Sequence, residues 1–195
     1  MAVTHWMMTN VPGCEVFHCN TGIGIERTRE FVRETCAAMG WPLHEVRAKE
    51  DCGQDYDELV MKHGFPGPDS HSMMYSQLKE RPIRKLVKAA QRKRGDRVLL
   101  ATGIRHEESA RRMRYAGKEV NRVGSQLWVS PIYWWSATER DAYNKAHGLP
   151  VNPVSAMLGM SGECLCGAYA HKGEKSLVKL VCPETHARIE ALELR

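Results

Sequence analysis

The sequence predicts an α/β fold in which helices flank a parallel β-sheet. Short apolar runs that read as strands alternate with amphipathic stretches, and glycine-containing turns follow the strands. The chain has 195 residues, of which 43% are hydrophobic and 26% charged, as in ordinary globular proteins. We therefore expect a single domain over residues 1–195, with the α/β core in 1–154 and a small helical, cysteine-containing region in 155–195.

Each element is predicted from the spacing of its apolar residues and from the residues that end it. Helical spacing predicts helices over 1–9, 25–39, 56–63, 76–93, 138–147, 175–181 and 184–194. Apolar runs bounded by turn residues predict strands over 14–19, 43–46, 97–101 and 126–130. Gly40 is expected to end the second helix, and Ser136 with Glu139 has the form of a capping box. We expect the long helix to be interrupted or restarted at Pro82, because proline lacks the N–H that a helix interior uses.

The formal net charge is +5, and basic residues concentrate in two stretches, Lys79 to Arg97 and Arg105 to Arg122. The first stretch reads mainly as the solvated face of an amphipathic helix. Attraction of an anionic substrate or of a nucleic acid is the functional alternative. Nucleic acid stays the second choice, because this helix lacks the interleaved aromatic residues that favour single strands.

The sequence contains seven cysteines: Cys14, Cys19, Cys36, Cys52, Cys164, Cys166 and Cys182. The N-terminus lacks the basic flank and cleavage site of a signal peptide, and no apolar run could cross a bilayer. We therefore expect a cytoplasmic protein without a membrane partner, in a compartment where structural disulfides are rare. Cys14, Cys19 and Cys36 read as small buried residues.

The stretch Gly103-Ile104-Arg105-His106-Glu107-Glu108-Ser109-Ala110-Arg111-Arg112 follows the third predicted strand. Its glycine would let the backbone approach an anion, and its guanidinium groups suit phosphate or sulfate oxygens. The structural alternative is a capped helix start with exposed ion pairs, which stabilise little. The stretch resembles the Gly-Ile-Arg-x-x-Glu-Ser-x-x-Arg signature of the phosphoadenosine phosphosulfate (PAPS) reductase family.

Other segments resemble the same family, in the same order along the chain. They are Phe17–Gly22 with Glu26 and Phe31, Tyr75–Ile83, Ser130–Glu139 and His147–Pro153. The resemblance implies a Rossmann-like parallel sheet of the adenine nucleotide alpha-hydrolase type. It also implies that ATP or PAPS binds at the carboxyl ends of the strands. The residues expected to contact the nucleotide or its sulfate are Thr21, Gly22, Lys79, Gly103, Arg105, Glu108, Ser109 and Arg112.

The sequence departs from the family in three places. Asn20 stands where the family usually has aspartate before Thr-Gly, and no Ser-Gly-Gly-x-Asp-Ser phosphate loop is found. Residues 1–8 resemble the helix that follows this loop, so either the protein begins upstream or its nucleotide chemistry is weakened. Loss of a central strand would expose sheet edges, which favours self-association. The family's C-terminal Glu-Cys-Gly-x-His motif is also missing near Arg195.

The segment Ser161-Gly162-Glu163-Cys164-Leu165-Cys166-Gly167 stands where iron–sulfur relatives place part of their cysteine set. The resemblance implies that Cys164 and Cys166 are the catalytic nucleophiles, since reactive thiolates need an accessible, electropositive setting. It also suggests that Cys164, Cys166 and Cys182 bind a metal, as part of a 4Fe–4S cluster. Such a cluster takes four cysteine ligands, so one is missing, and Cys52 or His71 is the substitute we consider.

Three functions follow as hypotheses. The first is a PAPS reductase-like oxidoreductase or sulfurtransferase with a thiol redox partner. Its cysteine would attack the sulfonate sulfur, or its substrate would be adenylated and then thiolated. The second is a component of nucleic-acid thiolation, similar to the enzymes of DNA phosphorothioation or tRNA thiolation. The third is a non-catalytic interaction module that lacks the phosphate loop.

Overall fold

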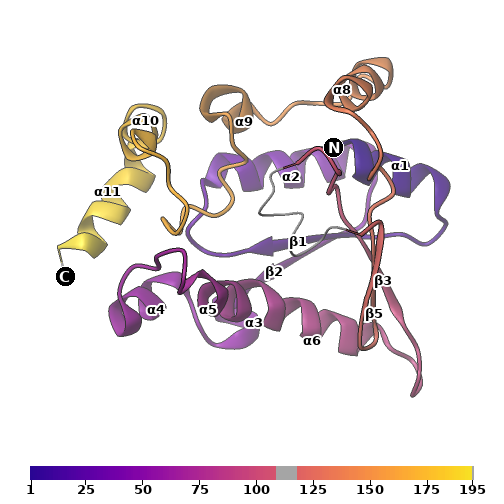
Figure 1. Ribbon diagram of the computed structural model, residues 1–195, viewed down its shortest axis with the longest axis horizontal. Helices are drawn as coiled ribbons and strands as arrows, with labels where there is room; N and C mark the ends of the chain where they lie inside the picture. The colour runs from indigo at the N-terminus through magenta and orange to yellow at the C-terminus, as the bar shows by residue number, and fades with distance from the viewer. Residues whose placement is uncertain (109–117, 195) are drawn as a thin grey trace. The chain divides into compact units, whose positions relative to one another are not determined.

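The computed structural model describes residues 1–108 and 118–194 (Figure 1). The chain forms two compact units, residues 1–15 with 86–150 and residues 16–85 with 151–195. Both units combine strands with helices, so the predicted α/β class is confirmed. Among the described residues, no helix has the length and apolar character needed to cross a bilayer.

The first unit is built on a three-stranded sheet with strand order β3-β5-β4. Its strands are β3 (Val98–Ala101), β4 (Val120–Val123) and β5 (Gln126–Val129), and its helices include α1 (Ala2–Asn10) and α8 (Ala137–Ala146). The predicted strands β3 and β5 pair in parallel, with Val98 opposite Gln126. At the start of α8, Ser136 Oγ accepts from Glu139 N at 3.1 Å and Glu139 Oε2 accepts from Ser136 N at 2.7 Å. The predicted capping box is therefore confirmed.

β4 was not predicted, and it pairs antiparallel with β5. A tight turn at residues 124–125 joins the two strands, and Gly124 adopts a left-handed φ of 61° there. Val120 and Val123 are 53% and 55% exposed, so β4 has no apolar face turned to a core. The segment Val-Asn-Arg-Val also lacks the strict alternation of apolar and polar residues that predicts a half-buried strand.

The second unit contains a parallel pair of strands, β1 (Val16–Asn20) and β2 (Leu43–Arg47), in register from Val16 opposite Leu43. Helix α2 (Glu26–Met39) contacts β1, and the π-helical turn η1 (Ser76–Glu80) also packs against β1. Figure 1 draws α2 above the strand pair and α5 below it. Gly40 follows α2 at φ 65°, so its predicted role at the helix end is confirmed.

The remaining helices of the second unit surround this strand pair. They are α3 (Ala48–Cys52), α4 (Tyr56–His63), α5 (His71–Tyr75), α9 (Pro153–Leu158), α10 (Glu174–Val181) and α11 (Pro183–Glu193). The core contains fully buried side chains from the loop after β1, from α4, from the α5–η1 helix and from α9. These are Ile23, Tyr56, Met74, Leu78 and Val154.

Pro82 does not interrupt the helix, because α5, η1 and α6 (Arg81–Ala90) follow one another without a gap. The alternative of a restart fits better, because the helix changes from π-helical to α-helical at Arg81. Proline cannot donate to the carbonyl four residues earlier, and its ring crowds that carbonyl. Here the Leu78 carbonyl accepts from the Cys19 thiol at 3.2 Å instead. The wider π-helical turn before Pro82 gives the ring room, so the helix continues.

Candidate functional site

Cys164 and Cys166 lie between α9 and α10 in the second unit and line a small pocket. The other side chains around the pocket are Thr21, His71, Met74, Tyr75, Leu78 and Lys79. Its volume of about 10 Å³ leaves room for about one water molecule. The structure therefore brings together both predicted nucleophiles and the predicted sulfate-binding Lys79.

The cysteine segment is held in place by its main chain. Four of its carbonyl oxygens accept hydrogen bonds from the loop after β1, from α2 or from α4. The donors and acceptors are Thr28 Oγ1 to Ser161 (2.6 Å), Ile25 N to Gly162 (2.8 Å), Thr21 Oγ1 to Glu163 (3.0 Å) and Tyr56 Oη to Cys166 (3.0 Å). Because these carbonyls are partnered, the two thiols sit on a rigid frame.

Gly24 allows this close approach of two distant segments. A Cβ atom at position 24 would lie 2.3 Å from the carbonyl oxygen of Glu163. That distance is far below a van der Waals contact, so only glycine fits there. The sequence did not predict this packing role, because a glycine's contact with a distant segment leaves no local pattern.

The two thiols differ in their proton affinity. A hydrogen bond from Cys166, followed by the charge of Lys79, lowers the pKa of Cys164 to about 6 against the opposing effect of burial. The same hydrogen bond raises the pKa of Cys166, and burial adds to the rise. Cys164 is therefore the thiolate of the pair and Cys166 is its hydrogen-bond donor.

Glu163 brings a carboxylate to the residue just before Cys164. Its Oε2 lies 3.3 Å from His18 Nε2, and its Oε1 lies 4.0 Å from Arg29 Nε. These atoms are close enough to attract one another but are not aligned for hydrogen bonds, and all of them are buried. A buried polar group that lacks a hydrogen bond is rare in folded proteins, so this cluster has spare bonding capacity for water or a ligand.

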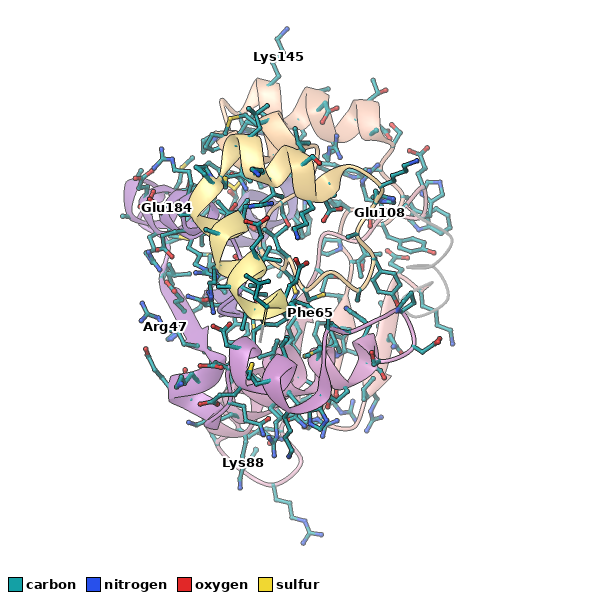
Figure 2. All side chains as sticks on the ribbon, turned by 90° about the vertical axis from the view of Figure 1, so that its left-hand side faces the viewer. Arg47, Phe65, Lys88, Glu108, Lys145 and Glu184 are labelled. Atoms are coloured by element: carbon teal, nitrogen blue, oxygen red, sulfur yellow. The ribbon has the colours of Figure 1, made fainter. Side chains whose placement is uncertain are left out.

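A larger cleft opens at the carboxyl ends of β1 and β2, within the second unit. It has a volume of about 270 Å³ and is lined by Asn20, Thr21, Gly22, Glu26, Arg29, Arg33, Arg47, Ala48, Lys49, Glu50, Asp55 and Arg188. Arg47 projects outward from the end of β2 in Figure 2, where its side chain is half exposed. Ligands of open parallel sheets bind at this edge.

Two of the predicted nucleotide-binding residues line this cleft. Thr21 is completely buried and lines both the cleft and the thiol pocket, so the two hollows share a wall. Gly22 follows with a left-handed φ of 82°, and its carbonyl accepts from the Arg188 guanidinium. Arg188 was not predicted, because a single arginine on an amphipathic terminal helix carries no sequence signal.

Gly103, Arg105 and Glu108 belong to the first unit, where they follow β3. Gly103 is exposed, whereas Arg105 is buried and donates from Nη1 to the Trp135 carbonyl at 3.2 Å. The Glu108 main chain donates to the Arg105 carbonyl at 3.1 Å. Figure 2 labels Glu108 on this turn. Two further predicted residues, Ser109 and Arg112, lie outside the described residues.

The carboxylate beside Arg105 comes from Glu107. Its Oε2 lies 3.6 Å from Arg105 Nη1 and also accepts from Ala137 N, at the start of α8, at 3.1 Å. Sequence reasoning did not select Glu107, because the family signature leaves that position open. The buried arginine thus ties the turn after β3 to the segment that leads into α8.

The predicted three-cysteine metal site is not supported by the structure. Among the side chains that the structure describes, which do not include that of Cys52, no group of three or more His, Cys, Asp or Glu is arranged to hold a metal ion. Cys182 packs at the edge of the hydrophobic core, and burial raises the pKa of its thiol. Two thiols alone do not make a 4Fe–4S site, which takes four cysteine ligands, so we derive no chemistry through a cluster.

The chain is similar to a known protein family and to a solved structure. A family profile described as phosphoadenosine phosphosulfate reductase domain matches residues 1–156. The fold is similar to that of a phosphoadenylyl-sulfate (PAPS) reductase from Candida auris, solved as a phosphate complex. That match has a TM-score of 0.57 at 19% sequence identity and covers 80% of this chain and 71% of the other. No match was found among curated proteins. The similarity supports the predicted Rossmann-like fold.

Proposed function

Because the chain belongs to the phosphoadenosine phosphosulfate reductase domain family, we propose that it binds an adenine nucleotide sulfate and reduces the sulfur at Cys164. The observation that carries this proposal is the pocket that holds Cys164, Cys166 and Lys79 beside the loop after β1. A thiolate, a neighbouring thiol and a cation are the groups that a two-electron reduction of a sulfonate requires.

In this proposal, the nucleotide occupies the cleft at the carboxyl ends of β1 and β2. Thr21 and Gly22 line that cleft, and Arg29 has two guanidinium nitrogens without a hydrogen-bond partner there. The family resemblance also implies nucleotide- or sulfate-binding roles for Gly103, Arg105, Glu108, Ser109 and Arg112, and these roles stay predictions. Phosphate and sulfate oxygens are the acceptors that such guanidinium groups bind best.

The chemical step is a displacement at sulfur. The Cys164 thiolate attacks the sulfonate sulfur, an S–S bond forms, and the bond from sulfur to the bridging phosphate oxygen breaks with its electron pair leaving on the nucleotide. Lys79 stabilises the sulfonate oxygens during this step, since it already lies beside the thiolate. The pocket holds only about one water molecule, so some of the side chains that line it must move before a sulfonate enters.

Binding and turnover can be tested separately on the full chain. We expect PAPS to give heat of binding in calorimetry, and sulfite to be released when dithiothreitol is supplied. Cys164→Ser should abolish sulfite release and keep nucleotide binding, whereas Cys182→Ser, outside the pocket, should keep both. Unchanged release by Cys164→Ser would refute the role of this thiol. Absence of any nucleotide binding would favour the non-catalytic interaction module.

A nucleic-acid substrate is the second candidate. In the first unit, the basic residues from the last turn of α6 to the start of β3 are exposed, and Figure 2 shows Lys88 projecting from α6. These residues are Lys88, Arg92, Lys93, Arg94 and Arg97. If they bind phosphates of tRNA or duplex DNA, affinity should fall steeply as salt rises. Binding that does not respond to salt would count against this candidate.

A further inference from the structure

We infer that Cys164 and Cys166 form a self-contained dithiol that closes to an intrachain disulfide, with Cys164 as the attacking sulfur and Cys166 as the resolving sulfur. For the sulfonate substrate, this inference rests on the proposed function. The thiol–disulfide chemistry itself needs no nucleotide, so it can be tested alone.

The first support is proximity on a rigid frame. The two thiols line one pocket and are hydrogen-bonded to each other, with one residue between them in the chain. Carbonyls on both sides of Cys164 are anchored, at Glu163 by Thr21 and at Cys166 by Tyr56. Because both thiols line a pocket of only about 10 Å³, we expect their sulfur atoms to meet with little main-chain movement.

The second support is that the two cysteines differ in exposure. Cys164 is half-buried and lines the pocket with Lys79, so it is the sulfur of the pair that a reagent meets once the side chains around the pocket move. Cys166 is only 6% exposed and belongs to the hydrophobic core. A thiol that is enclosed yet lines the same pocket as the reactive sulfur can attack only what Cys164 carries, which is the position that a resolving thiol occupies.

The third support is a change that follows modification of Cys164. While Cys164 is a thiolate, it accepts a hydrogen bond from the Cys166 thiol, and this raises the pKa of Cys166. Once Cys164 carries a sulfonate or is part of a mixed disulfide, it has no negative charge with which to accept that hydrogen bond. The pKa of Cys166 then falls, helped by the nearby charge of Lys79. The resolving thiolate therefore forms after the first step.

The second step balances as a thiol–disulfide exchange. The Cys166 thiolate attacks Cys164 Sγ, the Cys164–sulfonate bond breaks, and its electron pair leaves as sulfite. The two cysteine sulfurs lose two electrons in total, and the sulfonate sulfur gains them. The product disulfide must be reduced by an external dithiol, which names the class of redox partner this chain would need.

The inference is tested on the full chain with oxidised glutathione as the probe. The Cys164 thiolate should displace glutathione from the probe and form a mixed disulfide, which Cys166 then resolves. We expect peptide mapping by mass spectrometry to find a Cys164–Cys166 linkage that has lost two hydrogen atoms. Cys166→Ser should accumulate glutathione on Cys164, and Cys164→Ser should give neither product at this site. Cys182→Ser is the matched control and should behave like the parent chain.

Failure of this inference can be told apart from failure of the proposed function. A parent chain that accumulates glutathione on Cys164 without the internal linkage overturns the inference. A second result would also overturn it. With a monothiol as the only reductant, Cys166→Ser would release sulfite from PAPS through many turnovers as fast as the parent chain does. An internal disulfide in a chain that binds no PAPS supports the inference and refutes the proposed function. Circular dichroism should show that each variant is folded.

Discussion

Thr21 donates its hydroxyl to the main-chain carbonyl of Glu163 at 3.0 Å, and so joins the end of β1 to the residue before Cys164. Thr21 is completely buried, so water cannot replace the lost partner if the hydroxyl is removed. The same hydroxyl also helps to lower the pKa of the Cys164 thiol. One side chain therefore links the predicted nucleotide loop to the predicted nucleophile.

Thr21→Val should lower the free energy of unfolding by about 1–3 kcal/mol, because it leaves a buried carbonyl without its donor. It should also slow the reaction of Cys164 with iodoacetamide at pH 6, since the thiol keeps its proton longer. Urea unfolding and peptide mapping of the alkylated protein measure the two effects. Thr21→Ser keeps the hydroxyl, so it should keep most of the stability and most of the Cys164 reactivity of the parent chain. A valine variant as stable and reactive as the parent would contradict this role.

Gly24→Ala should displace the cysteine segment, because the added Cβ would lie 2.3 Å from the Glu163 carbonyl oxygen. Overpacking of this kind costs about 1–3 kcal/mol. We expect a lower melting temperature together with slower alkylation of Cys164. Gly67→Ala is the matched control in the same unit, because nothing lies within 4 Å of its Cβ position. If both variants have the same melting temperature, the close approach at position 24 does not affect the stability of the fold.

Alkylation of Cys164 should rise with pH around a midpoint of about 6, because the hydrogen bond from Cys166 and the charge of Lys79 favour the thiolate. Lys79→Met removes the cation, so it should move the midpoint to higher pH. Lys62→Met, on the exposed side of α4, should leave the midpoint unchanged. Equal midpoints in all three proteins would exclude Lys79 from the thiolate's surroundings.

The contact between α1 and α8 should make stability depend on pH. His5 Nδ1 lies 2.8 Å from the Tyr143 hydroxyl, and burial followed by the facing His147 lowers the pKa of His5 from 6.5. Below pH 6.5 the unfolded chain binds a proton that folded His5 takes up only at lower pH. Stability is therefore full above that value and declines as the pH falls. His5→Gln should flatten this decline in urea titrations at several pH values, and an equally steep decline would show that other groups cause it.

The capping box of α8 offers a simple test of local stability. Ser136→Ala removes the acceptor for the Glu139 main-chain N–H and should cost about 1 kcal/mol in thermal or urea unfolding. Ser136→Thr keeps an oxygen at this position and should lose much less. Equal losses in both variants would mean that the hydroxyl does not cap the helix.

The sequence predicted elements whose signals are local. The helix over 56–63 and the cap at Ser136 could be read from neighbouring residues alone, and both are confirmed. The strand β4 was missed because its valines are exposed, and the sequence did not show that the helix stays unbroken at Pro82, where Cys19, distant in sequence, supplies the missing donor. Local patterns do not contain such long-range partners.

The candidate site, like the fold, could be predicted from the sequence only in part. The sequence marked Cys164 and Cys166 as the candidate nucleophiles, and the structure places both in one pocket with Lys79, while their reactivity stays a prediction. The contacts that position them could not be predicted, because Thr21 and Gly24 meet Glu163 only after the chain has folded. The predicted roles of Ser109 and Arg112 stay predictions.

The absence of a side chain at position 24 has an evolutionary consequence. As long as the Glu163 carbonyl occupies that space, no heritable change at position 24 is tolerated unless residues near 163 shift as well. Two segments that are far apart in the gene must then diverge together. We expect relatives that replace this glycine to carry a rearranged or shortened thiol segment, which surveys of newly sequenced genomes can reveal.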